Sequence, residues 1–330
     1  MNNYNGLIAQ ASGSVVATLP IHRFFASDID EHAQNMDGWH VRYDQLTPGR
    51  FEGELVEFRA DWMRLVRDRS NQAMTKSGAA WKGAITFSIP LSAHGPVFCS
   101  GHPIHEPSML VAHGDNLPDL STPRQLDLLG VAIDEQALAH VLECQGSHFR
   151  ITDLPKCYRL GDSTVRADLA LLFEELTNGD QARAVLLGYD SIRRGIRDAV
   201  MLHVLDLVAP DHAPPLSPTA RKRMVDRARE YALSHVDEPL SILDLCNHIG
   251  ASRRKLQYCF QETLGINPVA YLRALRLNAV RRELRTGTQL QGVQQVAARW
   301  GFWHLSRFSS DYRTLFGECP SQTLRRAELC

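Results

Sequence analysis

A stretch near the end of the chain places hydrogen-bonding side chains at helical spacing. Within residues 253–264, Leu256, Phe260 and Leu264 recur every four residues and predict a buried face. The residues left on the other side of this predicted helix are Arg253, Arg254, Gln257, Tyr258 and Gln261. Arg can pair with guanine and Gln with adenine in the major groove of DNA. A plain solvated helix face would look the same, so this stretch alone does not decide between the two interpretations.

An internal repeat favours DNA reading. Leu264-Gly265, followed by Pro268, returns 52 residues later as Phe316-Gly317, followed by Pro320. The second copy predicts a helix from about His304 to Phe316. Its outward candidates are His304, Ser306, Arg307, Ser310, Arg313 and Thr314. Two copies of one unit at a fixed offset are unlikely by chance, so we expect two helix-turn-helix units.

The first copy carries the start and stop signals that such a unit needs. Ser217 and Pro218 predict the start of a leading helix that runs to about His235. The pair Ser241 and Asp244 resembles a capping box at the start of a short second helix. Gly250 then supplies the turn, and Ser252 caps the helix that begins at Arg253.

A single helix over residues 267–285 is predicted to connect the two copies. A rigid connector would let one chain read two successive major grooves, which lie about 34 Å apart on one face of B-DNA. Its arginines are candidates for phosphate contacts, which position a protein without reading sequence. They are Arg273, Arg281, Arg282 and Arg285.

Charge is divided unevenly along the 330 residues. The net charge is −1, but residues 219–330 hold 18 Lys and Arg against 10 Asp and Glu, a net +8, and the rest carries −9. Such asymmetry suggests a nucleic-acid-binding module joined to another domain. We therefore expect domains at 1–208 and 219–330, joined by a proline-rich linker at 209–218.

The first domain is expected to be β-rich, which makes the chain α+β overall. Strands are predicted at 51–58, at 84–89, where Pro90 ends the strand, and at 126–133. Short strands without long intervening helices indicate a small barrel or sandwich. Asp134 is expected to cap a helix through His140. A longer helix over 181–208 carries an apolar stripe that packs either on its own domain or on a second subunit.

Residues 220–328 resemble the AraC/XylS family of transcriptional regulators. The resemblance rests on the stretch 245–252, on Leu264-Gly265 with Pro268, and on Trp300-Gly301-Phe302 with Phe316-Gly317 and Pro320. Cys246 departs from the family, which usually has Ala there. The resemblance implies a cupin-like effector-binding and dimerisation domain, a homodimer, double-stranded DNA and RNA polymerase as partners, and DNA contacts from Arg254, Gln257, Tyr258, Ser306, Arg307 and Ser310.

Three further stretches are similar to regulators of ethanolamine utilisation within this family. They are residues 276–284, 300–305 and 43–51. This similarity implies an activator that responds to ethanolamine together with adenosylcobalamin. The alternatives are a regulator of another catabolic or stress operon with an unrelated effector, and a non-enzymatic module that docks on another protein.

Other chemistry finds little support in the sequence. Four histidines at 94, 102, 105 and 113 show no spacing for three convergent metal ligands. Hydrolase and nucleotide-binding motifs are missing, so we expect no enzyme and no catalytic residues. Seven irregularly spaced cysteines indicate reduced thiols in a cytoplasmic protein, with neither a transmembrane helix nor a secretory signal. Trp39, Trp62, Trp81 and Tyr43 either line an effector pocket or fill the core.

Overall fold

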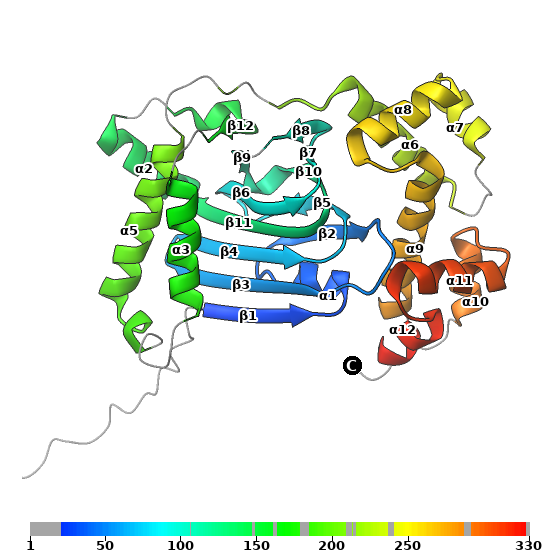
Figure 1. Ribbon diagram of the computed structural model, residues 1–330, viewed down its shortest axis with the longest axis horizontal. Coiled ribbons are helices and arrows are strands. Elements are labelled where there is room, and N and C mark those ends of the chain that lie inside the picture. Colours follow the sequence, from blue (N-terminus) through cyan, green and yellow to red (C-terminus); the bar gives the residue numbers. More distant parts are fainter. Residues whose placement is uncertain are drawn as a thin grey trace, which may run out of the picture.

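The computed structural model contains a β-rich N-terminal part and a helical C-terminal part (Figure 1). It describes residues 21–105, 107–146, 149–160, 164–178, 185–208, 213, 216–236, 241–286 and 292–327. Of the linker expected at 209–218, residues 209–212, 214 and 215 lie outside this set.

The strands of the N-terminal part form two antiparallel sheets. In spatial order, the first sheet contains β1 (Ile21–Ala26), β3 (Gly53–Ala60), β4 (Met63–Ser70), β11 (Arg124–Asp134), β6 (Ala84–His94), β9 (Ser108–His113) and β12 (Lys156–Arg159). The second contains β2 (His40–Gln45), β5 (Met74–Ala79), β10 (Leu117–Thr122), β7 (Val97–Cys99) and β8 (His102–Ile104).

Alternation along the central strands gives the first sheet two different faces. Leu129, Val131 and Ile133 of β11 are buried on the face that packs against helices. Leu128 and Gly130 point the other way and line a cavity between the two sheets. This period of two is what a sheet covered on both faces requires.

The three predicted strands are present, with one error. Residues 51–58, 84–89 and 126–133 fall largely in β3, β6 and β11. Pro90 does not end its strand, because β6 continues to His94. Pro90 lies opposite Leu128, where the register with β11 shifts. Proline lacks an N–H donor but is tolerated at such a bulge, so the strand can pass through it.

Helices α2 (Glu135–Gln145), α3 (Val165–Thr177) and α5 (Asp190–Leu207) cover the outer face of the first sheet. Asp134 caps α2, as expected. The predicted helix over 181–208 is interrupted, because the chain turns at Gly188 before α5 begins, and residues 181–184 lie outside the described set. The apolar stripe divides: Val200, Val204 and Leu207 are buried, whereas Tyr189 and Ile192 are exposed.

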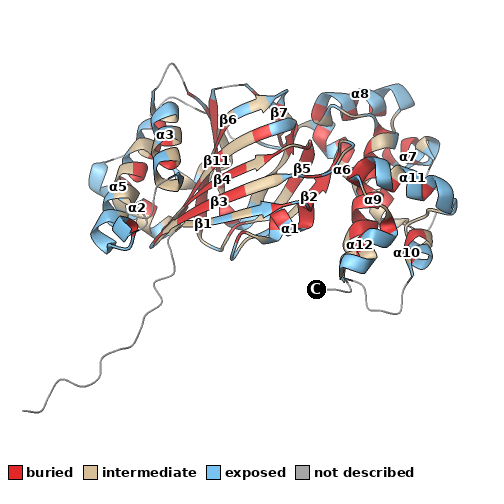
Figure 2. Ribbon diagram, turned by 60° about the horizontal axis from the view of Figure 1, so that its bottom comes forward, coloured by how far each residue is buried: buried red, intermediate tan, exposed pale blue. Residues whose placement is uncertain are grey.

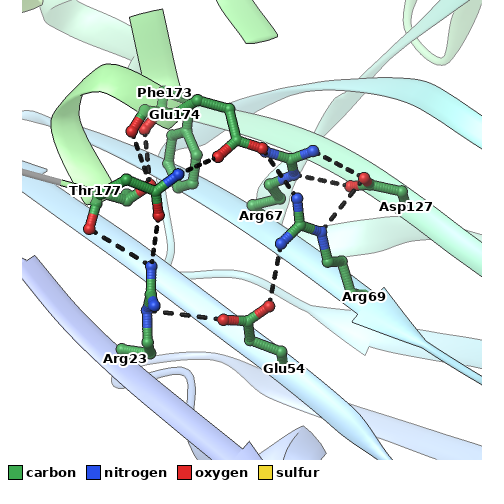
Figure 3. Close-up of polar contacts among 9 residues, drawn as sticks. Arg23, Glu54, Arg67, Arg69, Asp127, Phe173, Glu174 and Thr177 are labelled. Atoms are coloured by element: carbon green, nitrogen blue, oxygen red, sulfur yellow. Dashed lines mark hydrogen bonds and ion pairs between the residues drawn. The ribbon is translucent and has the colours of Figure 1, made fainter. Parts of the chain in front are cut away.

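An ion-pair network fastens α3 to the sheet (Figure 3). Arg67 of β4 pairs with Asp127 of β11 at 2.8 Å and also with Glu174 of α3. Arg69 joins the same two carboxylates at 3.2 and 3.0 Å. Because two arginines bridge strand and helix carboxylates, the position of α3 on the sheet is fixed on this side.

The C-terminal part contains only helices among its described residues. They are α6 (Ala220–Ser234), α7 (Ile242–Ile249), α8 (Arg253–Leu264), α9 (Pro268–Thr286), α10 (Val293–Arg299), α11 (Leu305–Phe316) and α12 (Pro320–Ala327). The expected start at Ser217 and Pro218 is wrong. Thr219 caps α6 instead, since its hydroxyl accepts the N–H of Lys222 at 3.0 Å.

Helix α9 passes from the α6–α8 group to the α10–α12 group, beside β2 (Figure 1). Its buried residues contribute to one core that also contains Phe260 of α8 and Tyr312 of α11. Figure 2 shows the mostly buried sheets and α9, and the exposed outer surfaces of α8 and α11. A rigid connecting helix, as expected over 267–285, is therefore present with slightly different ends.

Candidate nucleic-acid interface

The pair α7 and α8 forms a helix, a turn and a second helix through local capping. Asp244 Oδ2 accepts the N–H of Ser241 at 2.9 Å, and Ser241 Oγ accepts the N–H of Asp244 at 3.1 Å, which is a complete capping box. Gly250 ends α7 with φ +72°. The hydroxyl of Ser252 then caps α8 by accepting the N–H of Lys255. Each of these steps agrees with the sequence prediction.

The pair α10 and α11 repeats this order with a different turn. Gly301 has φ +76°, and His304 precedes α11 without a capping bond from its side chain. Phe308, Tyr312 and Phe316 form a buried ladder of rings with centroids 5.7 and 4.7 Å apart. This ladder holds one side of α11 on the core, so the other side faces solvent.

All ten residues predicted to contact DNA are exposed. They are Arg253, Arg254, Gln257, Tyr258 and Gln261 on α8, and His304, Ser306, Arg307, Ser310 and Arg313 at α11. Arg221 of α6 lies 5.9 Å from the Tyr258 ring and extends the basic surface beside α8. The exposed side chains of both helices therefore remain available to a polyanion.

A groove of about 430 Å³ separates the first helix pair from the second. Val269 and Arg273 of α9 line one wall, and Trp303, His304 and Arg307 line the other. Trp303 is 61% exposed, whereas the other four Trp residues are at least partly buried. Sequence reasoning missed this residue, although its place directly before His304 in the second turn could have indicated it.

Three of the four predicted phosphate contacts are wrong. Arg281 is buried against Asp28, Arg282 pairs with Asp44 at 2.6 Å, and Arg285 also pairs with Asp28. They lie on the side of α9 that faces the N-terminal part. Arg273 lies on the groove side, where it pairs with Asp311 at 3.5 Å. Helical periodicity shows which residues share a face but not which neighbour covers it.

The N-terminal part encloses a mostly apolar cavity of about 90 Å³ between its two sheets. Trp39 and Tyr43 line it, as one of the two interpretations expected. Trp62 instead packs on the outer helices beneath Arg197, and Trp81 meets the edge of Trp39 at 6.1 Å. Aromatic residues here therefore serve both the cavity and the packing around it.

The cavity wall contains a buried ion pair that sequence reasoning missed. Lys76 Nζ lies 2.5 Å from Asp68 Oδ2, and His32 Nε2 lies 2.9 Å from Asp68 Oδ1. Burial by itself raises the pKa of the Asp68 carboxyl, but Lys76 and His32 outweigh it and hold the pKa well below its usual range. His32 lies 36 positions before Asp68 in the sequence, so no local motif indicates this cluster.

The described residues offer neither a metal site nor a membrane-spanning helix. No group of three or more His, Cys, Asp or Glu side chains there is arranged to hold a metal ion. Within the same residues, every helix is too short or too polar to cross a membrane.

Sequence comparison finds relatives of the C-terminal part. A family model described as a helix-turn-helix domain matches residues 245–326. A probable thc operon regulatory protein of Rhodococcus erythropolis is 37% identical over 103 residues, which are 31% of each chain. A XylDLEGF operon transcriptional activator of Pseudomonas putida is 34% identical over 100 residues, 30% of this chain and 64% of that protein. The chain thus spans about a third of the length of the first of these relatives.

Solved structures show the same limited similarity. A probable AraC family transcriptional regulator from Rhodopseudomonas palustris is 34% identical, with 32% of this chain and 97% of that chain covered and a TM-score of 0.30. The AraC-like transcriptional activator CuxR is 16% identical, with 79% and 96% covered and a TM-score of 0.38.

Proposed function

We propose, from the premise that the last third of this chain carries a helix-turn-helix domain of the AraC/XylS type, that the protein is a sequence-specific transcriptional regulator. The observation that carries this proposal is that all ten polar and basic residues on α8 and at α11 are exposed. Both helices then act as DNA-reading helices, with α9 setting their separation. Residues 219–330 are the DNA-binding domain, and RNA polymerase is the partner on the promoter.

Residues 1–208 act in this proposal as the effector-binding and dimerisation domain. The cavity between the sheets limits the effector to a small molecule. Its volume is about 90 Å³, and an engineered cavity of about 150 Å³ holds benzene. Ethanolamine is small enough for such a space. Adenosylcobalamin, which the sequence similarity implies as a co-effector, is many times larger and does not fit this cavity, so no step is assigned to it.

Effector binding is tested by thermal shift of the full chain with ethanolamine and with adenosylcobalamin, each alone and together. A ligand that binds the native state raises the melting temperature. A shift with ethanolamine that is abolished by filling the cavity, as in Ala112→Leu, supports the proposed site. If neither compound shifts the melting temperature, the ethanolamine proposal is contradicted, whereas the regulator proposal is unaffected.

DNA reading is tested by selecting bound sequences from a pool of random duplexes with the full chain. We expect two sequence elements separated by about one helical turn, roughly 10 base pairs. Arg307→Ala should weaken binding to the selected duplex by about 1–3 kcal/mol, because a base contact is lost. Circular dichroism should stay unchanged, since Arg307 is exposed.

The matched control is Arg194→Ala, which removes an exposed arginine from α5 and should leave DNA affinity unchanged. A pool that shows no enriched sequence contradicts the proposal. That result favours the rival interpretation, in which the basic domain docks on an acidic protein.

A further inference from the structure

The two sides of α9 have different neighbours. At 100° per residue, positions 269, 272, 273 and 276 share one side, and positions 278, 281, 282 and 285 share the opposite side. The first set lines the groove beside Trp303 and Arg307. The second set meets the N-terminal domain through ion pairs and hydrogen bonds. The N-terminal domain therefore docks behind the proposed DNA-reading surface and leaves that surface uncovered.

The contact behind α9 is buried and specific. Arg281 donates to Asp28 Oδ2 from Nε at 2.8 Å and from Nη2 at 2.5 Å. Arg282 Nη2 donates to Asp44 Oδ1 at 2.6 Å. The Asn278 amide accepts the N–H of Gln45 at 3.0 Å and donates to its carbonyl at 2.9 Å. Separating the two domains would leave buried charges and an amide without these hydrogen bonds. The cost of leaving them unpaired opposes separation.

Asp28 both caps α1 (Ile29–Gln34) and binds α9. Its Oδ1 accepts the backbone N–H groups of Asp30 and Glu31, both at 2.9 Å, and so caps α1. Its Oδ2 accepts from Arg281 of α9. One carboxylate thus joins the start of α1 to the helix between the two helix-turn-helix pairs. A movement of α1 must change the geometry of the Arg281 contact.

The same helix also reaches the cavity. His32 of α1 bonds to Asp68, and Asp68 pairs with Lys76 in the cavity wall. Met36, two residues beyond α1, lines the cavity directly. An occupant that displaces Lys76 or Met36 therefore acts on α1.

Strand β2 provides a second connection. Val41 and Tyr43 line the cavity. Asp44 and Gln45, the next two residues, bond to Arg282 and Asn278 of α9. Both α1 and β2 therefore have one part at the cavity and another part at α9.

We infer that Asp28 and Asp44 are positioning residues that transmit occupancy of the cavity to α9, and through it to the placement of α8 and α11. The inference rests on the proposed function and specifies its regulation. Occupancy shifts the population between two placements of α9, and DNA favours one of them. The effector therefore acts from behind the DNA-reading surface, without uncovering it.

Hydrogen exchange of the full chain tests the connection without DNA. Lys76→Met changes the cavity wall, and Ala112→Val, which adds volume there without removing a charge, is the second variant. Both should speed exchange in α1 and in residues 278–285 of α9. The control Asp127→Asn disturbs the Arg67 and Arg69 pairs on the other face of the sheet and should leave α9 unchanged. Faster exchange in α1 with no change in α9, for both variants, overturns the inference.

A double-mutant cycle tests the effect on DNA. Lys76→Met should change the affinity for the selected duplex by about 2- to 30-fold, the range for coupled positions. This change should disappear in an Asp44→Asn background and return with Asp44→Glu, which restores a carboxylate. Equal changes in all three backgrounds overturn the inference. Failure of the wild type to bind DNA would contradict the proposed function, and the exchange experiment would still decide the connection between cavity and α9.

Discussion

At the scale of single residues, the structure divides the arginines by their neighbours. Arg307 and Arg254 remain exposed, whereas Arg281 is buried between Asp28 of the N-terminal domain and Glu318 of the turn before α12. The residue type is the same, and its role follows from what covers it. An exposed guanidinium can meet phosphate or guanine, but a buried one paired with two carboxylates holds helices together.

Asp68 should make stability depend on acid pH. Its folded pKa is lowered, because Lys76 and His32 outweigh the opposing effect of burial, so the charged form contributes stability above the unfolded pKa of about 3.9. That contribution is lost as the pH falls from about 4 toward the lower folded pKa. Tyr43, whose own pKa burial raises well above its usual value, stays neutral throughout this range.

Urea unfolding at neutral and acid pH measures this effect. Asp68→Asn should lower the free energy of unfolding at pH 7 by about 3–5 kcal/mol, because it leaves Lys76 buried without its charge partner. The variant should then lose less stability than the wild type on acidification. Equal pH dependence in both proteins would show that Asp68 is not responsible.

At the scale of elements, α3 and α5 expose apolar residues that their own domain does not bury. Leu171 is 62% exposed on α3, and Ile192 is 42% exposed on α5. The network in Figure 3 holds α3 on the sheet through Glu174, one turn along the helix from Leu171. Large apolar side chains that are exposed on two neighbouring helices are typical of an interface, which supports the proposed homodimer.

Charge introduced at this surface should separate the subunits. Leu171→Arg combined with Ile192→Arg should halve the mass seen by sedimentation velocity at micromolar concentration, because a charge would be buried at the interface. Phe25→Arg, at a residue of β1 that is 70% exposed, is the control and should leave the mass unchanged. An unchanged mass for the double variant places the interface elsewhere.

At the scale of the whole molecule, an acidic domain docks on a basic one. Residues 219–330 carry a net +8 and the rest carries −9. Three ion pairs join the oppositely charged domains. Basic residues of the second domain pair with acidic residues of the first: Arg281 with Asp28, Arg282 with Asp44, and Lys222 with Asp119. Arg253, Arg254, Arg307 and Arg313 keep exposed positive charge on the helices that we propose to read DNA.

DNA affinity should therefore fall steeply with salt. Neutralising six or more phosphates would reduce the binding constant by about a thousandfold between about 50 and 200 mM salt, because condensed counterions are released. Fluorescence anisotropy with the selected duplex measures this slope. Arg313→Gln should make the slope shallower by about one, whereas Arg194→Gln should leave it unchanged. A slope near zero would contradict binding through the basic surface.

Local signals in the sequence are enough to predict the helical third of the molecule. The apolar spacing of Leu256 and Phe260, the capping pair Ser241 and Asp244, and the turn at Gly250 each act within a few residues. Repetition of the unit and the exposed faces of both helices followed from the same periodicity. Alternation likewise located the main strands of the first domain.

The contacts between these elements depend on the three-dimensional fold. The pairing of Asp28 with Arg281 joins residues 253 positions apart, and the cavity forms between strands of two sheets. Periodicity gives the direction of a side chain relative to its own helix or strand, and it carries no information about which distant element packs there. For that reason the sequence predicts phosphate contacts for Arg281, Arg282 and Arg285, whereas in the folded molecule all three pair with the N-terminal domain.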